Sequence, residues 1–166
     1  MSKHLFKNNV GFTLIELIIV IAIIGLLAAA AFVAIDPAKR IGAANDAQRW
    51  EDVTAITEAY LKHVVDNNGT HPTTTAEAGI YYAIMASSTV GMSSYDCQNI
   101  TEDDTMGVQL EILIPTYLPT MPVDPSGIAN AGKNTGYYFM KSSGGRIIIG
   151  ACAESDYATA SIYVQR

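Results

Sequence analysis

The most apolar stretch of the chain covers residues 12–35, and Glu16 is its one charged residue. As an α-helix this stretch would be about 36 Å long, which is enough to cross the hydrocarbon core of a bilayer. No later stretch of the chain is comparably apolar. The pattern therefore predicts a membrane-spanning helix near the start of the chain.

Residues 37–66 predict a second helix, or a continuation of the first, because their apolar side chains recur mostly at three- and four-residue steps. Pro37 removes one backbone hydrogen bond, so we expect a kink there or a new helix N-terminus capped by Asp36. Asn68-Gly69 predicts the end of this helix. The residues expected to form one apolar stripe are Ile41, Ala44, Trp50, Val53, Ile56, Tyr60 and Val64.

After Gly69 the helical period fades, and Gly, Thr, Ser and Pro become common. We expect a short helix over residues 75–85, an irregular polar loop over 87–107 and a short strand or helical turn over 110–114. Prolines then exclude regular structure. They are Pro115, Pro119, Pro122 and Pro125.

The last third of the chain has the pattern of a β-sheet. "TGYYFMKSSGGRIIIGACAE", residues 135–154, predicts a hairpin that turns at Ser143-Gly144-Gly145, and "SIYVQR", residues 161–166, predicts one more strand. We expect this sheet to pack on the apolar stripe of the 37–66 helix. The fold class is therefore α+β, with a long N-terminal helix on a small C-terminal antiparallel sheet.

Charge and length narrow the possible functions. The chain has 166 residues, enough for one ordinary globular domain and an extra element, and its formal net charge is −6. An acidic exterior argues against nucleic acid as the main partner. Lys3 and Lys7 precede the apolar stretch without a neighbouring acid, so residues 1–11 form a short basic leader.

A basic start before an apolar stretch is also the pattern of a secretory signal peptide, and Ala28–Ala31 offers A-x-A cleavage sites. The stretch is long for that purpose, since the apolar part of a signal peptide usually has about 7–15 residues. Glu16 also argues against it. A carboxylate at the centre of a membrane helix costs roughly 2.5–3.5 kcal/mol, and a conventional signal peptide gains nothing from one.

"GFTLIELIIVIAIIGLLAAAA", residues 11–31, resembles the prepilin signature shared by type IV pilins and type II secretion pseudopilins. The resemblance rests on a Lys-bearing leader that ends in Gly11, on Phe12 and on an acid at Glu16. It implies that a prepilin peptidase cleaves after Gly11 and that the new amine of Phe12 is methylated. The apolar helix would then stay on the mature protein. The segments "NNGTHP" and "YLPTMPVDP" are also similar to parts of major pseudopilins and pilin-like proteins.

The resemblance implies three regions: a leader at 1–11, a transmembrane and fibre-core helix at 12–35, and an exported pilin-like domain at 36–166. The chain departs from the family pattern at two places. Pilins often carry a proline nearer the middle of the apolar helix, whereas Pro37 follows it and Gly25 is the interior helix breaker. Pseudopilins often bind calcium after a "P-x-D-P" segment. Here no acid follows Asp124 until Glu154, so the calcium site is not carried over. No cofactor loop or metal cluster occurs elsewhere in the sequence, and we expect no cofactor.

Glu16 is interpreted in two ways. It could be an idle acid that favours the helix dipole, or an assembly residue that needs a positive partner within the membrane. Residues 12–37 contain no Lys, Arg or His, but cleavage would create the amine of Phe12. Glu16 of one subunit could bind its own amine or that of an incoming subunit. Within the family pattern we favour the assembly role.

The resemblance implies a structural subunit of a type IV pilus or pseudopilus, and not an enzyme. Its partners would be like subunits in a helical homopolymer, other pilin-like subunits, the prepilin peptidase, an inner-membrane assembly platform and its ATPase. The subunit would cross the inner membrane once, in contact with lipid, before it joins an extracellular filament. Adhesion, twitching motility, DNA uptake and protein secretion all stay open. The alternative is a membrane-tethered exported enzyme or binding domain.

Cys97 and Cys152 both follow the apolar stretch, and paired cysteines of exported proteins usually bridge, so we expect a Cys97–Cys152 disulfide. A nucleophilic cysteine with His63 or His71 as its base is the alternative, and no local motif supports it. Residues 127–134, "GIANAGKN", nearly match a phosphate loop, but Asn134 replaces the required hydroxyl and a strand follows. We interpret them as a turn.

Two further patterns are common in surface loops. Several acids lie between residues 96 and 104, and their spacing fits no calcium loop, so we interpret them as solvated. Asn68 and Asn99 each begin an N-x-T sequence, which accepts a glycan only in a host that attaches one.

Overall fold

The computed structural model describes residues 11–72, 76–85, 107–127 and 134–166. The chain divides into two compact units, Met1–Arg40 and Ile41–Arg166. The first unit contains the helix α1 and the first turn of α2. The second unit contains the rest of α2 and a five-stranded sheet.

Helix α1 covers Leu14–Ile35, and none of its 22 residues is buried. Thr13 caps its start: the backbone is extended there, and Oγ1 accepts a hydrogen bond from the backbone N–H of Glu16 at 3.3 Å. The helix ends at Asp36, whose φ is 44°. The side chain of Asp36 then accepts a bond from the N–H of Lys39 at 3.3 Å. The predicted new N-terminus at Pro37 is therefore confirmed.

Helix α2 covers Pro37–Asp66. Its end is also confirmed: Asn68 and Gly69 have positive φ, and the N–H of Gly69 bonds to the carbonyl of Val64 at 2.8 Å. The face that α2 buries differs from the predicted stripe. The buried residues are Arg49, Val53, Ile56, Thr57, Ala59, Tyr60 and His63.

The predicted stripe of α2 is right from Val53 onward and wrong before it. Ile41 and Trp50 are 63% and 43% exposed, and Ala44 is exposed as well, whereas Arg49 is buried. An apolar period locates the residues that water disfavours. It does not locate a helix segment that is held by buried polar contacts, which is the case here.

The sheet has the strand order β2-β1-β3-β4-β5. The α+β class and the antiparallel pairing of the C-terminal strands β3, β4 and β5 are confirmed. The sheet as a whole is mixed, because β1 pairs antiparallel with β3 but parallel with β2, which the sequence did not predict. A parallel pair needs a connection of about a dozen residues or more. Residues 86–106 provide that length. The strands are β1 Tyr81–Met85, β2 Gly107–Gln109, β3 Asn134–Lys141, β4 Ile147–Ala151 and β5 Tyr163–Gln165.

The short helix expected over residues 75–85 is wrong, because β1 occupies its second half. Tyr81, Tyr82 and Ile84 favour a strand, and β1 gains partners on both sides. The predicted hairpin of β3 and β4 is confirmed, with Gly145 at positive φ in its turn, and so is the last strand, β5. Residues 111–113 form a single 3-10 turn, η1, one of the two structures expected there.

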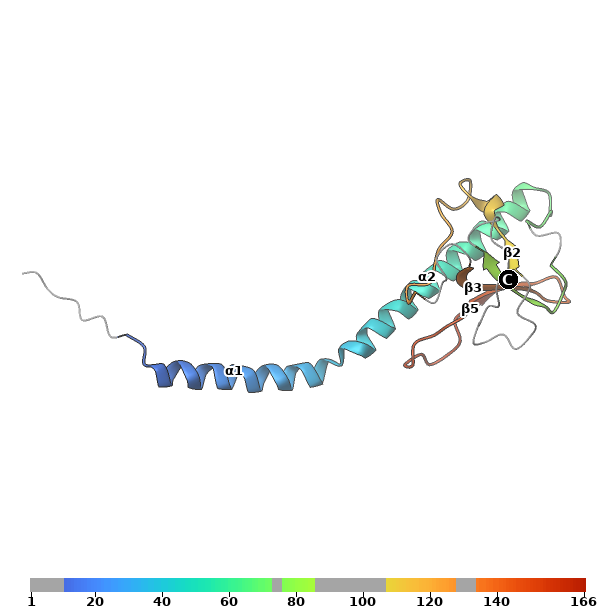
Figure 1. Cartoon of the computed structure of the whole chain (residues 1–166). Helices are drawn as coiled ribbons and strands as arrows, with labels where there is room; N and C mark the ends of the chain where they lie inside the picture. Colours follow the sequence, from blue (N-terminus) through green and yellow to red (C-terminus); the bar gives the residue numbers. More distant parts are fainter. Residues whose placement is uncertain (1–10, 73–75, 86–106, 128–133) are drawn as a thin grey trace, which may run out of the picture. The chain divides into compact units, whose positions relative to one another are not determined.

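The core of the second unit lies between α2 and one face of the sheet (Figure 1), so the predicted packing is confirmed. The ring of Tyr60 on α2 lies 5.3 Å from the ring of Phe139 on β3. Ile56, Tyr137 and Ile149 are fully buried beside them. Burial of such side chains contributes about 1.5–3 kcal/mol each.

The opposite face of the sheet contains a close contact between two strands. Tyr138 of β3 is paired with Gly150 of β4. A Cβ atom at position 150 would lie 2.5 Å from the ring of Tyr138, so the ring covers the glycine. Tyr138 and Cys152 are both buried on this face, with Tyr81 and Ile148 packed against them.

Candidate functional site

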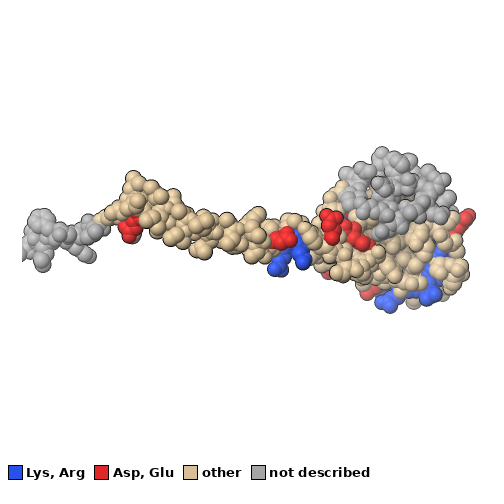
Figure 2. Space-filling view, turned by 90° about the horizontal axis from the view of Figure 1, so that it is seen from below, with Lys and Arg blue, Asp and Glu red and all other residues tan. Residues whose placement is uncertain are grey.

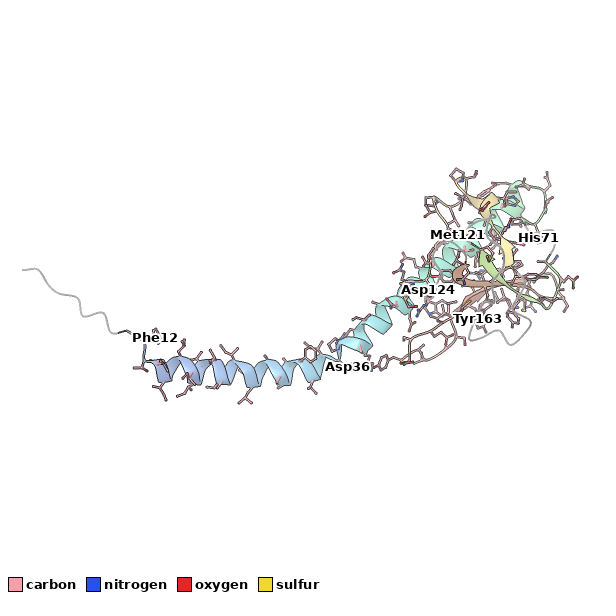
Figure 3. All side chains as sticks on the ribbon, in the orientation of Figure 1. Phe12, Asp36, His71, Met121, Asp124 and Tyr163 are labelled. Carbon is pink, nitrogen blue, oxygen red and sulfur yellow. The ribbon has the colours of Figure 1, made fainter. Side chains whose placement is uncertain are left out.

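The start of α1 presents the residues to which the sequence assigns processing and assembly. Phe12 is 86% exposed at the beginning of the described chain (Figure 3), and Glu16 is exposed one turn into the helix. Thr13 binds the backbone N–H of Glu16, not its side chain. Within the described residues no hydrogen bond or ion pair is made by the Glu16 carboxylate, so it is available to a partner.

The surface of α1 is apolar on all sides. Figure 2 shows acidic atoms only near the beginning of this helix and uncharged atoms along its remaining length. The helix is long and apolar enough to cross a membrane by length and composition. None of the residues of α1 is buried by the described part of the chain. Such a helix needs an apolar environment to remove its side chains from water.

Residues 7–32 match the family model of the prokaryotic N-terminal methylation motif. The chain carries the type IV pilin and pseudopilin signature. The resemblance found in the sequence is thus confirmed for this segment, which includes Gly11, Phe12 and Glu16. The signature supports a pilin-like precursor whose apolar helix anchors it in the membrane. No curated protein and no solved structure matches the chain significantly.

The signature does not test the individual roles within it. Cleavage after Gly11, methylation of Phe12 and assembly through Glu16 stay predictions.

A second group of polar residues, absent from the sequence predictions, is buried where α2 meets the segment before β3. Arg49 binds Asp124 through two parallel contacts, Nε to Oδ2 at 2.7 Å and Nη2 to Oδ1 at 3.0 Å. Both side chains are almost fully buried, 3% and 0% exposed. Figure 3 shows Asp124 beside α2. The paired geometry is the strongest form of an Arg–carboxylate contact.

Further hydrogen bonds extend this group to the segment after β4. Arg49 Nη1 donates to Asp46 at 2.8 Å, and Asp46 accepts bonds from the backbone N–H and the hydroxyl of Ser155. Ser126 donates its N–H to Asp124 at 2.8 Å. We call Asp46, Arg49, Asp124, Ser126 and Ser155 the polar cluster. It joins three segments that are distant in sequence.

The hydrogen bonds of the polar cluster shift the pKa values of its charged side chains. Burial acts to raise the pKa of Asp124, but hydrogen bonds from Arg49 and Ser126 outweigh it and hold that pKa below its ordinary value. The pKa of Asp46 is lowered in the same way, against burial, by Ser155 and Arg49. The hydrogen bond with Asp124 raises the pKa of Arg49. All three groups are therefore ionised at neutral pH.

Asp52 behaves differently, because burial raises its pKa although Tyr137 donates a hydrogen bond to it at 2.6 Å. The hydroxyl of Tyr137 is buried next to this carboxylate, and its own pKa is raised. This bond ties α2 to β3 beside the polar cluster.

Gly136 makes room for the polar cluster. Its φ is +85°, and a Cβ atom there would lie 2.4 Å from the Cβ of Asp124. Two signals in the sequence could have located the cluster. Arg49 lies four residues before Val53, on the buried stripe of α2. Asp124 is the one acid of the "P-V-D-P" segment, between two prolines that hold it in a fixed loop.

The remaining candidate residues do not gather into a reactive centre in the described part of the chain. His63 packs edge-on against Tyr117 at 5.7 Å, and His71 Nδ1 lies 3.1 Å from the hydroxyl of Tyr60. No group of three or more His, Cys, Asp or Glu residues that could hold a metal occurs among the described residues.

Cys152 is buried at the end of β4, but Cys97 lies outside the described residues, so their bridge stays a prediction. The acidic residues between 96 and 104, Asn99 and most of the 127–134 segment also lie outside them.

Proposed function

We propose that this protein is the structural subunit of a type IV pilus or a related pseudopilus. The observation that carries the proposal is a pilin-type helix of 22 residues without one buried residue. Before assembly, lipid covers that helix. In the filament, the helices of neighbouring subunits cover it, and the domain of residues 41–166 faces outward.

Processing prepares the subunit for assembly. A prepilin peptidase cleaves between Gly11 and Phe12, and the new amine of Phe12 is methylated. This amine is the positive charge nearest to Glu16, because residues 12–37 contain no Lys, Arg or His. Thr13 already caps the backbone at the start of α1, so the Glu16 carboxylate can bind the amine of an incoming subunit. Such pairing gives each new subunit a defined axial register.

The partners follow from this role. They are further copies of the chain, other pilin-like subunits, the prepilin peptidase, and an inner-membrane platform with its ATPase. The subunit crosses the inner membrane once and then becomes part of an extracellular filament. A Cys97–Cys152 bridge would form after export, because the oxidising environment outside the cytoplasm favours disulfides.

The competing function is a membrane-tethered enzyme or binding domain. One feature favours it, an open groove of about 480 Å³ that is lined by α2 together with Tyr117 and Leu118. Its walls are mainly apolar. Glu58 and Lys62 are the charged residues in its lining, and they lie one helical turn apart with no nucleophile between them. We therefore propose a structural and not an enzymatic role.

Two measurements on one sample test the proposal. Material sheared from the surface of cells that express the chain should contain it as a major filament band. The intact mass of that band should correspond to a chain that begins with methylated Phe12. A chain found only in the membrane fraction would favour the tethered alternative. A mature N-terminus in the 28–36 region would indicate an ordinary signal peptide and contradict the processing step.

A further inference from the structure

The turn after α2 contains the only Asn-Gly pair of the chain, Asn68-Gly69. Both residues are exposed, and both have positive φ, 53° for Asn68 and 87° for Gly69. A residue in this left-handed conformation is a common way to end a helix. The surroundings of Gly69 are open, since a Cβ atom there would meet nothing within 4 Å. The turn therefore combines an exposed amide side chain with a small neighbour that nothing covers.

An asparagine that is followed by glycine can lose its side-chain amide in water. The backbone nitrogen of the glycine gives up its proton to hydroxide and attacks Cγ of the asparagine, and ammonia leaves as the Cγ–Nδ2 bond breaks. Water then opens the cyclic imide at either carbonyl, which gives aspartate or isoaspartate. The reaction consumes water, releases ammonia and needs no oxidant. Glycine permits the attack best, because it has no Cβ atom to hinder the approach.

The two neighbouring asparagines of the turn differ in their readiness to react. Nδ2 of Asn67 donates a hydrogen bond to the carbonyl of His63 at 2.8 Å, and the residue that follows Asn67 has a Cβ atom. The side chain of Asn68 makes no hydrogen bond with another described residue. The position that can react is therefore Asn68.

The nucleophile of this reaction is held by the helix. The backbone N–H of Gly69 donates to the carbonyl of Val64 at 2.8 Å, and the N–H of Thr70 donates to the carbonyl of Asn67 at 3.0 Å. The attacking nitrogen of Gly69 must lose the proton that it shares with Val64, so this bond has to break first. Helix ends open locally at a much lower free energy than the core. The attack on Asn68 therefore depends on opening of the last turn of α2.

We propose that Asn68 is a deamidation site whose rate is controlled by the C-terminal cap of α2. The closed cap protects Asn68, and each opening exposes it to attack by Gly69. The product carries a carboxylate at the C-terminal end of the helix, where negative charge is unfavourable, two residues after Asp66. Isoaspartate also adds a carbon atom to the backbone of the turn. Deamidation therefore weakens the cap that delays it, and it removes the N-x-T acceptor at the same position.

The experiment measures deamidation of the full-length protein in detergent, in mildly alkaline water that is enriched in heavy oxygen. The label enters each new carboxylate, so mass spectrometry separates new product from earlier damage and assigns it to Asn67 or Asn68. A synthetic peptide of residues 64–72 gives the rate in the absence of the helix cap. Labelled product should form at Asn68 and not at Asn67, and several-fold more slowly in the folded protein than in the peptide.

Asn67→Ala tests the control by the cap. It removes the hydrogen bond from Nδ2 to the His63 carbonyl and leaves the Asn68-Gly69 pair unchanged. Labelling of Asn68 should become several-fold faster in the folded protein, while the rate in the corresponding peptide stays nearly the same. Glu58→Ala is the matched control, because it truncates an exposed side chain of the same helix away from the cap. Its rate should equal that of the wild type.

Three results would overturn the inference. Absence of labelled product at Asn68 in both the peptide and the protein would show that Asn68 is not a deamidation site. Equal rates in the folded protein and the peptide would show that the cap gives no protection. An Asn67→Ala protein that is labelled as slowly as the wild type would contradict control by the cap. The proposed filament role is tested separately, because these measurements are made on the isolated protein.

Discussion

At the level of single residues, Glu16 combines two properties that rarely occur together in a membrane helix. It occupies the third helical position after the Thr13 cap, where a negative charge favours the helix dipole. Its carboxylate nevertheless makes no hydrogen bond or ion pair with another described residue. Because the backbone at the helix start is satisfied by Thr13, the side chain can serve a second chain at little cost to its own helix.

Glu16→Gln keeps the shape of the side chain and removes its charge, while Glu16→Val removes both. Both variants should be inserted and cleaved, because the Gly11–Phe12 junction is unchanged. Both should be poorly incorporated into filaments, since the Phe12 amine of an incoming subunit would lack its partner. The measurement is the yield of sheared filament from cells that express each variant alone. Wild-type yield from Glu16→Val would show that the carboxylate has no register role.

Arg49→Met should destabilise the domain strongly, because it keeps the length of the side chain and leaves the Asp124 carboxylate buried without its cation. Removal of one partner of a buried ion pair costs about 3–5 kcal/mol. The measurement is urea unfolding of the full-length protein in detergent, followed by Trp50 fluorescence. Glu51→Gln is the matched control, because Glu51 lies on the same helix and is exposed.

The double variant Arg49→Met/Asp124→Leu separates two contributions to the free energy of unfolding. One is the loss caused by a buried charge without a partner, and the other is the net stabilisation by the ion pair. The double variant removes both charges and fills the space with apolar side chains, so most of the lost stability should return. A double variant as unstable as Arg49→Met would show that the guanidinium contributes through packing and not through its charge.

Acid should weaken the same cluster. The pKa values of Asp46 and Asp124 are lowered in the folded state, so their stabilisation is complete above the ordinary value of 3.8 and is lost as the pH falls below it. Asp52, with a raised pKa, opposes part of this loss. The free energy of unfolding should therefore change little from neutral pH to the ordinary carboxylate range and then decrease.

The Arg49→Met/Asp124→Leu variant is the control for this prediction, since it lacks one of the two carboxylates. Its stability should decrease less than that of the wild type over the same acid range. Equal decreases in the two proteins would place the acid-sensitive groups elsewhere in the chain.

At the level of elements, local signals in the sequence sufficed where one short segment decides the structure. Asp36-Pro37 begins a helix, Asn68-Gly69 ends it, and the glycine turn before residue 146 makes a hairpin. The local signals gave the wrong structure where a segment's conformation depends on a partner that is distant in sequence. Residues 81–85 became a strand because β2 and β3 pair with it on both sides, and neither partner is adjacent in sequence.

The candidate site likewise has one part that local sequence signals predict and one part that depends on distant partners. The residues around Glu16 form a short continuous pattern, so the sequence was enough to predict the signature. The polar cluster joins Arg49 to Asp124 and Asp46 to Ser155, and no local period connects these positions. The apolar period of α2 therefore placed Ile41 and Trp50 in the core, whereas the buried ion pair turned them outward.

A disulfide between Cys97 and Cys152 should tie the chain before β2 to the end of β4. It would close a loop of roughly 55 residues, which the chain-entropy account values at about 4 kcal/mol before strain. Peptide mapping of filament protein without reduction should recover the two cysteines in one cross-linked peptide pair. Alkylation of both thiols in unreduced, exported protein would show that the bridge is absent.

At the level of the whole molecule, the two units have different sources of stability. The unit of residues 41–166 has its own core between α2 and the sheet. Helix α1 has no core and depends on its surroundings, first lipid and then, in the proposed filament, other subunits. A folded domain joined to an uncovered helix can thus exist in both environments without refolding, which a pilin-like precursor requires.

Because Tyr138 and Gly150 are in contact across neighbouring strands, the residues that can be accepted at one position depend on the residue at the other. A side chain at 150 would overlap the ring of Tyr138, so a substitution there requires that ring to move or position 138 to become smaller. A large residue at 138 in turn favours glycine opposite it. In descendants of this sequence the two sites should therefore covary, with one large partner and one small partner exchanged across the same rung of the sheet.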